Sequence, residues 1–176
     1  AIINNEKNSG ITAHIIDEGC DTGEILSQVI IPISQNDTGN DILNKYKSKY
    51  FSLTKDVLDK IESNKLAPLI QDESLATYYG IRKPEDGRIN WNWHKERIRD
   101  WVRAQANPYP GAFSFVNGNK LTVDEVEEVS NGFNSLTENG IVLEIEPTII
   151  VKTSNGALKL TKIREEIKIL KGDQLI

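Results

Sequence analysis

The 176-residue chain has few of the features that mark membrane, secreted or disulfide-bonded proteins. It contains a single cysteine, Cys20, so no disulfide can form within it, and such cysteine usage fits a reducing cytoplasm. No apolar run approaches the roughly 20 residues needed to span a bilayer. No signal peptide opens the chain. These absences predict a cytoplasmic protein without a membrane partner.

Signatures of metal sites and of nucleic-acid binding are also missing. The two histidines, His14 and His94, are far apart in sequence, and no histidine or cysteine cluster has metal-ligand spacing. The net charge of -5 gives no electrostatic reason to expect a nucleic-acid partner. With 38% hydrophobic and 27% charged residues, the composition is that of an ordinary globular protein. We therefore expect no metal, and either one sizeable domain or two small ones.

Residues 10–28 predict two strands that enclose an acidic loop. Residues 11–16 alternate as a partly buried strand does, and residues 25–33 are apolar and β-branched enough for a second, well-buried strand. Between them, residues 17–23 include two glycines, which let a backbone approach a ligand closely. From the residues alone, Asp21 is either a turn-capping residue or a functional carboxylate.

A long helix is predicted over residues 40–63, because apolar residues recur there at intervals of three and four. Asp37 or Thr38 would cap its start, and Asn64 would stop it. Residues 78–88 then form a long loop in which basic residues stand beside two tyrosines. This loop either grips an anionic, aromatic ligand such as a nucleotide or is solvated and anchored by its tyrosines.

The remainder changes from helical to β-rich. Residues 89–91 look like a short buried strand, and a second helix opens at Asn92 or His94 and runs to about Ala104. The two prolines within residues 107–111 end that helix, and we place a domain boundary there. Asn117-Gly118 and Asn155-Gly156 are turn signals. They separate short strands that suggest a small barrel, at residues 112–116, 121–129, 141–145, 149–153 and 158–163.

Taken together, these segments resemble the folate-dependent formyltransferase family. Four motifs occur in the family's order over roughly residues 1–125: GITAHIIDEGCDTGEILSQ, a DT pair before the long helix, RKPEDGRINW and VRAQANPYPGAF. The resemblance implies an α/β fold. It would consist of the C-terminal portion of a nucleotide-binding-like catalytic domain in residues 1–106, followed by a small OB-like β-barrel in residues 107–176.

The resemblance implies transfer of a formyl group from 10-formyltetrahydrofolate to a primary amine, without a metal. In the family an Asn and a His polarise the formyl carbonyl, and an Asp orients the His and a water and helps to remove the amine proton. Asp21 matches the family's Asp-x-Gly position, and His14, seven residues earlier, would point toward the same pocket. The expected cofactor-binding residues match the loop that receives the pterin ring: Asp17, Glu18, Gly19, Cys20 and Gly23.

The family's Asn-x-His motif is not found, and it would precede Ala1. The chain also lacks an initiating methionine. We therefore expect a fragment of a longer formyltransferase that is inactive by itself. A different class of function, a non-catalytic binding module, is what such a fragment would be if expressed separately.

Two acceptors compete within the family, methionyl-tRNA and an amino sugar attached to a nucleotide. After Ala106 the chain has seven Lys and Arg residues against ten Asp and Glu residues, a net charge of -3, which is the wrong sign for a tRNA platform. We favour the sugar-nucleotide branch. On this interpretation Arg82 and Arg103 contact the pyrophosphate or sugar, and Tyr79 or Tyr109 packs against a ring.

Arg103 has a second interpretation, as a cation at a helix C-terminus. A homodimer is compatible with the resemblance.

Overall fold

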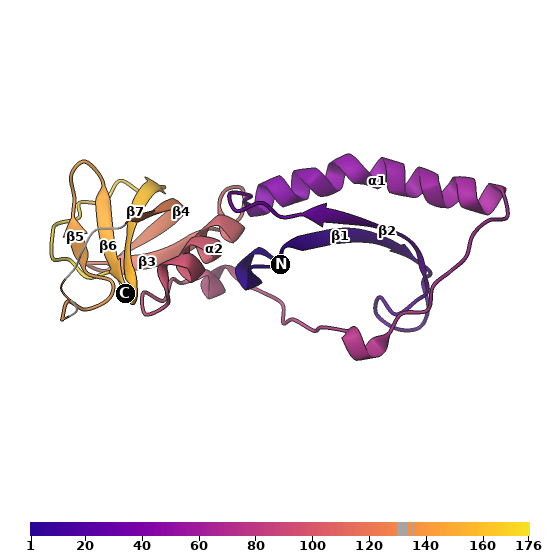
Figure 1. Cartoon of the computed structure of the whole chain (residues 1–176). Coiled ribbons are helices and arrows are strands. Elements are labelled where there is room, and N and C mark those ends of the chain that lie inside the picture. The colour runs from indigo at the N-terminus through magenta and orange to yellow at the C-terminus, as the bar shows by residue number, and fades with distance from the viewer. Residues whose placement is uncertain (130–133, 135) are drawn as a thin grey trace. The chain divides into compact units, whose positions relative to one another are not determined.

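The computed structural model describes residues 1–129, 134 and 136–176, which form two compact units (Figure 1). Unit 1 holds residues 1, 6–35 and 41–81, and unit 2 holds residues 2–5, 36–40 and 82–176. In chain order the elements are the 3-10 helix η1 (Ile2–Asn4), β1 (Asn8–His14), β2 (Ile25–Pro32), α1 (Gly39–Glu62), η2 (Glu73–Leu75), η3 (Pro84–Gly87), α2 (Lys95–Gln105), β3 (Ala112–Val116), β4 (Asn119–Val129), β5 (Val142–Glu144), β6 (Ile149–Thr153) and β7 (Gly156–Ile163).

Unit 1 is an antiparallel hairpin of β1 and β2 with α1 alongside it (Figure 1). Ser27 Oγ of β2 donates to Asp56 Oδ2 of α1 at 2.8 Å. Ile31 is 3% exposed but its neighbour Ile30 is 69% exposed. The prediction of a well-buried second strand is therefore wrong, because successive side chains of a strand point to opposite faces and only one face is covered here.

The first strand ends at His14 and does not extend to Ile16 as the alternation predicted. The register between β1 and β2 shifts between Ala13 and His14, and Ile15 N makes one further backbone bond, to Glu24 O at 3.0 Å. Ile16 is 91% exposed. The alternation of apolar and polar residues therefore extends two residues beyond the end of the paired strand.

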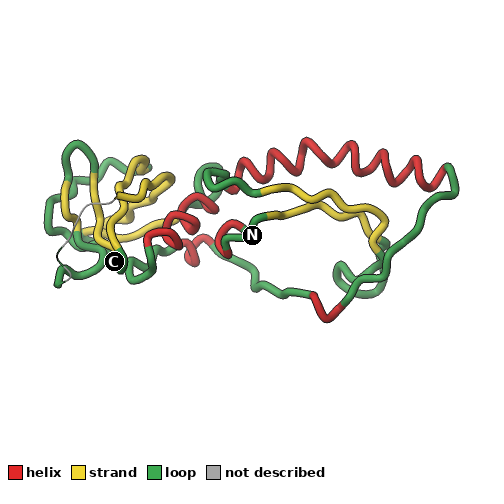
Figure 2. Tube along the Cα trace, viewed as in Figure 1, coloured by secondary structure: helices red, strands yellow, loops and turns green. Residues whose placement is uncertain are grey.

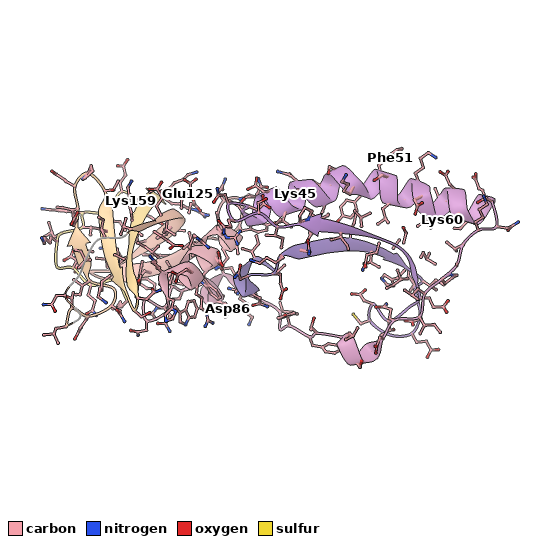
Figure 3. All side chains as sticks on the ribbon, in the orientation of Figure 1. Lys45, Phe51, Lys60, Asp86, Glu125 and Lys159 are labelled. Carbon is pink, nitrogen blue, oxygen red and sulfur yellow. The ribbon has the colours of Figure 1, made fainter. Side chains whose placement is uncertain are left out.

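Helix α1 confirms the helix predicted over residues 40–63 to within one residue at each end. Ile42, Leu53 and Val57 are its buried residues. Asn64 stops the helix as expected: its φ is 51°, and Lys65 N bonds back to Lys60 O at 2.9 Å. Phe51 lies on the opposite side of the helix, away from β1 and β2 (Figure 3).

Unit 2 is built on a five-stranded antiparallel sheet of order β3-β4-β7-β6-β5. The predicted turn at Asn117-Gly118 is confirmed, with φ values of 50° and 78° between paired residues Val116 and Asn119. The hairpin predicted at Asn155-Gly156 also forms, although its two-residue loop lies one position earlier, between the paired Thr153 and Gly156.

Residues 173–176 lie between the two edges of this sheet. Ile176 exchanges two backbone bonds with Phe115 of β3, each 2.9 Å long. On the other side, Val142 N of β5 bonds to Asp173 O at 2.9 Å, and Leu175 N bonds to Gly140 O at 2.8 Å. This segment closes the sheet, a role that the sequence pattern did not indicate. The OB-like classification stays a prediction.

The core of unit 2 lies between α2 and the sheet, with Ile98 and Val102 fully buried against strand residues such as Leu121. The strand predicted at residues 89–91 is wrong. Those residues make one backbone bond to β3, from Ile89 N to Phe113 O at 2.7 Å, before the chain turns away toward α2. Their predicted burial is confirmed, since Ile89 and Trp91 are buried and Trp91 Nε1 donates to Ser114 Oγ of β3 at 3.0 Å. The boundary expected after residue 106 lies inside unit 2 and stays a prediction.

Candidate functional site

The loop between β1 and β2, together with His14 at the end of β1, carries the predicted catalytic and cofactor-binding residues (Figure 2). Asp17 organises its first half: its Oδ1 accepts bonds from Gly19 N at 3.0 Å and from Thr22 Oγ1 at 2.7 Å. These two donors, the hydroxyl first, hold the pKa of Asp17 below its ordinary value of 3.8. The carboxylate is therefore ionised at neutral pH and fixes the fold of the loop.

The second half of the loop is held from outside it. Gln71 Nε2 donates to Asp21 O at 2.8 Å and to Gly23 O at 2.6 Å. At Gly23 a Cβ atom would lie 1.8 Å from Ile15 O, so no larger residue fits between the two limbs of the loop. Asp21 itself has a φ of 59°, a left-handed conformation that Asp adopts more readily than most residues. The backbone conformation of the loop thus fixes the position from which the Asp21 side chain projects.

His14 and Asp21 come together, with His14 Nε2 at 3.5 Å from Asp21 Oδ1. His14 Nδ1 lies 2.9 Å from Ile15 O. A carbonyl oxygen only accepts, so Nδ1 carries a proton and Nε2 is the nitrogen directed at the carboxylate. The Asp21 side chain is 86% exposed and that of His14 25%. The pair therefore joins an anchored imidazole to a carboxylate that remains open to a substrate.

The residues expected to receive the pterin ring lie in the same loop as Asp21. Glu18, Gly19 and Cys20 are exposed, and Cys20 is a free thiol. At Gly19 a Cβ atom would meet Thr22 Oγ1 at 2.1 Å. A side chain at Gly19 would therefore collide with Thr22, and Gly23 is buried between the limbs of the loop. The assignment of these residues to the pterin ring stays a prediction.

The four residues expected to bind the acceptor fall in different places. Tyr79 lies in unit 1 and is 74% exposed. Arg82 and Tyr109 line one cavity of unit 2. Arg103 does not line that cavity: its Nε donates to Asp100 Oδ1 at 2.9 Å and its Nη1 to Asp37 O at 2.6 Å, and the side chain is 11% exposed. The structure thus brings together two of the four.

An ion pair beside that cavity, between a buried carboxylate and a partly exposed arginine, was not foreseen. Asp124 of β4 is 4% exposed, and Arg164, just beyond β7, donates to its two oxygens at 2.7 and 3.0 Å. Arg164 lowers the pKa of Asp124 from its ordinary value of 3.8. The available signal was an acidic residue directly after the apolar Val123 in a predicted strand, but its partner 40 positions away follows from no local pattern.

Within the described residues, no group of three or more His, Cys, Asp or Glu side chains is placed to hold a metal ion. Among those same residues, no helix combines the length and apolar character required to cross a membrane.

Comparison with known proteins defines the class. The model of the formyl transferase C-terminal domain matches residues 82–176, more than half of the chain, and the formyl transferase model matches residues 1–58. The chain belongs to the formyltransferase family.

Among curated relatives, the chain is 34% identical over 166 residues to a methionyl-tRNA formyltransferase of Caldanaerobacter subterraneus subsp. tengcongensis, covering 94% of this chain and 53% of that protein. Among solved structures, an N-formyltransferase from Helicobacter canadensis in complex with folinic acid and dTDP-3-aminofucose is 25% identical, with a TM-score of 0.66, covering 93% of this chain and 58% of that one. A sugar 3N-formyl transferase, WlaRD, is 26% identical with a TM-score of 0.65, covering 92% and 58%. The chain spans about half the length of the curated relatives it matches.

Proposed function

We propose that the complete protein containing this chain transfers a formyl group from 10-formyltetrahydrofolate to a primary amine. The observation that carries the proposal is the contact between His14 and Asp21 at 3.5 Å, in a loop whose backbone is held by Asp17 and Gln71. The Helicobacter canadensis structure contains folinic acid, and the WlaRD structure was determined in the presence of 5-N-formyl-THF. The backbone of residues 17–20 is our candidate for the pterin-binding surface, whereas the buried Gly23 serves to bring the two limbs of the loop together.

In the proposed reaction the cosubstrate supplies a formyl carbonyl to the amine nitrogen of the acceptor. As the new carbon–nitrogen bond forms, the amine must lose a proton, and the exposed Asp21 carboxylate is our candidate to accept it. In its imidazolium form His14 orients the carboxylate, because its Nδ1–H then donates to Ile15 O while its Nε2–H faces Asp21 Oδ1. The bond between the formyl carbon and the donor nitrogen then breaks, and that nitrogen takes up the proton lost by the amine, which yields tetrahydrofolate and the formylated acceptor.

We propose a nucleotide-linked amino sugar as the acceptor. Two observations support it: the net charge of -3 after Ala106, and the sugar N-formyltransferases among the solved neighbours. Methionyl-tRNA is the second candidate, favoured by the 34% identity to a methionyl-tRNA formyltransferase. Formyl-transfer assays with both acceptors, run in parallel on the complete gene product, separate the two.

The test of the catalytic assignment is Asp21→Asn in the complete protein. We expect turnover to fall by about 10²–10⁴-fold, since general acid-base groups commonly contribute this much. Asp59→Asn is a matched control, because Asp59 is a solvent-exposed carboxylate on α1 paired only with Lys55. If Asp21→Asn retains near-normal turnover, the role of Asp21 is wrong, and the chain acts as a non-catalytic binding module.

A further inference from the structure

Asn-Gly pairs occur at four places in the chain, at residues 117–118, 131–132, 139–140 and 155–156. In such a pair the glycine nitrogen can attack the side-chain carbonyl carbon of the asparagine, because glycine has no Cβ atom to obstruct the approach. The attack closes a five-membered succinimide, and the glycine N–H proton leaves with the side-chain nitrogen as ammonia. Water then opens the ring to aspartate or isoaspartate. Residues 131–132 lie outside the described residues, and the other three pairs differ in how the fold holds them.

The pair Asn139-Gly140 is held by hydrogen bonds at every group that would react. Asn139 Nδ2 donates to Asn92 Oδ1 at 2.9 Å, and Asn139 Oδ1 accepts from Nζ of the buried Lys152 at 3.0 Å. The attacking nitrogen is also engaged, because Gly140 N donates to Lys152 O at 2.8 Å. Deamidation of Asn139 would therefore have to break three hydrogen bonds first.

Asn155-Gly156 is held in a similar way. Asn155 Oδ1 accepts from Lys95 N at 2.8 Å and Asn155 Nδ2 donates to Glu96 Oε2 at 2.9 Å, which attaches the side chain to the start of α2. Gly156 is buried and pairs with Thr153 at the start of β7. Deamidation of Asn155 requires this part of unit 2 to open, and the free energy of that opening lowers the rate.

Asn117-Gly118 lies in the turn between β3 and β4, and both residues are exposed. Among the described residues, a Cβ atom added at Gly118 would meet no heavy atom within 4 Å beyond its chain neighbours. Asn117 Nδ2 donates to Asp173 Oδ2 at 3.1 Å, in a bond that is exposed to solvent. Such a bond contributes little free energy, so the turn can rearrange for the attack without opening the sheet.

Asp173 connects this turn to residues 173–176, the segment that closes the sheet of unit 2. Asp173 Oδ2 also accepts from Leu170 N at 2.8 Å, and the main-chain oxygen of Asp173 accepts from Val142 N of β5 at 2.9 Å. The Asn117 side chain is therefore bonded to a carboxylate of the closing segment. A carboxylate in place of the Asn117 amide would turn this attraction into repulsion between like charges.

We propose that Asn117-Gly118 is a site of spontaneous deamidation, that the fold selects it over Asn139-Gly140 and Asn155-Gly156, and that the new carboxylate loosens the closing segment. The reaction needs no enzyme and consumes only water. An isoaspartate would also lengthen the main chain of the turn by one carbon atom. The site is independent of the proposed formyl transfer, and its state depends on the age of the molecule.

The rates are measured on the 176-residue chain, incubated in parallel in buffer and in concentrated urea at the same mildly alkaline pH. Trypsin places the three described sites on separate peptides, at residues 104–120, 121–152 and 153–159. Fragment masses then identify each asparagine whose amide has been hydrolysed. The sites can thus be followed in a single sample, and each serves as a control for the others.

In urea we expect similar rates at the three sites, because each asparagine precedes a glycine. In the folded chain Asn117 should react at close to its rate in urea. Asn139 and Asn155 should react about tenfold or more slowly, because their reaction requires local opening. The slow reaction of these two sites also verifies that unit 2 is folded in the sample.

Asn117→Asp reproduces the charge of the product. We expect the Val142 amide, which donates to Asp173 O, to exchange its hydrogen about two- to fivefold faster than in the natural chain, since exposed charge pairs have weak effects. Adding Asp173→Asn removes the repulsion and should restore the natural exchange rate. Asn64→Asp is the matched control, because Asn64 has a φ of 51° against 50° for Asn117 and lies in unit 1.

The proposal is overturned if Asn117 is as strongly protected in the folded chain as Asn155, or if all three sites react there at their rates in urea. It is also overturned if Asn117→Asp leaves the exchange of the Val142 amide unchanged. None of these measurements involves formyl transfer, so the failure of the proposed reaction and the failure of this site are distinguishable.

Discussion

At the scale of single residues, two acidic side chains show how differently the fold can use a carboxylate. Asp21 is exposed, and its position comes from backbone bonds made by Gln71 and from the space left by Gly23. Asp124 is buried, and its bonds with Arg164 and Asn107 N offset the free-energy cost of removing its charge from water. The first arrangement leaves a carboxylate available for chemistry, and the second uses one for structure.

We expect Asp124→Asn to lower the free energy of unfolding by about 2 kcal/mol. The value lies below that for a fully buried pair, because the Arg164 side chain is 31% exposed. Urea unfolding at neutral pH measures it. Glu125→Gln removes a neighbouring carboxylate whose pair with Lys162 is solvent-exposed, and should cost under about 0.5 kcal/mol. Equal losses in the two variants would contradict the structural role of Asp124.

The stabilisation by Asp124 should also depend on pH. Its folded-state pKa lies below the ordinary 3.8, so the unfolded chain binds the proton more readily. The contribution is therefore fully present above the unfolded value and is lost as pH falls through the lower, folded value. The stability difference between the natural chain and Asp124→Asn should persist at pH 5 and shrink below 3.8, as acid titrations of unfolding can measure.

At the scale of elements, α1 has one face that packs on the hairpin and one that does not. Leu53 is 6% exposed and Phe51, two positions earlier, is 80% exposed. Both are large and apolar, so hydrophobicity alone does not distinguish them. The helical period separates their directions by more than half a turn.

We expect Leu53→Ala to destabilise unit 1 by about 2–4 kcal/mol, since it removes buried methyl groups and leaves a cavity. Phe51→Ser should change stability by less than about 0.5 kcal/mol, because the side chain is already in water. Thermal unfolding of the two variants in the 176-residue chain gives the comparison. A loss for Phe51→Ser as large as for Leu53→Ala would mean that α1 is rotated from the orientation described.

At the scale of the whole molecule, the closure of the sheet in unit 2 joins residues from opposite ends of that unit. Leu175 is 2% exposed within the core, while the adjacent Ile176 is 57% exposed. Backbone bonds from this segment reach Phe115 on one side and Gly140 on the other. The segment therefore both fills the core and pairs two strand edges.

Leu175→Ala should destabilise unit 2 by about 2–5 kcal/mol, whereas Ile176→Ala should have little effect. Hydrogen exchange adds a local measurement, because the amide of Phe115 donates to Ile176 O in the closed sheet. We expect its protection to fall in Leu175→Ala and to be kept in Ile176→Ala. Unchanged protection in both variants would show that the segment does not close the sheet.

The sequence by itself determined the local elements of this protein. The spacing of Ile42, Leu53 and Val57 is enough to define α1, and the left-handed tolerance of Asn117-Gly118 is enough to define a turn. Both depend on residues of a single continuous segment of the chain. For the same reason the motif around Asp21 could be recognised before its geometry was known.

Only the tertiary structure decided which distant residues meet. Arg164 finds Asp124 across 40 positions, and Ser114 Oγ bonds to Ile176 O across 62. Nothing in the local sequence selects these partners, because each is chosen by strand order and register, which depend on the folded sheet as a whole. The tertiary structure therefore gathered Arg82 and Tyr109 into one cavity and left Arg103 outside it, bonded to Asp100.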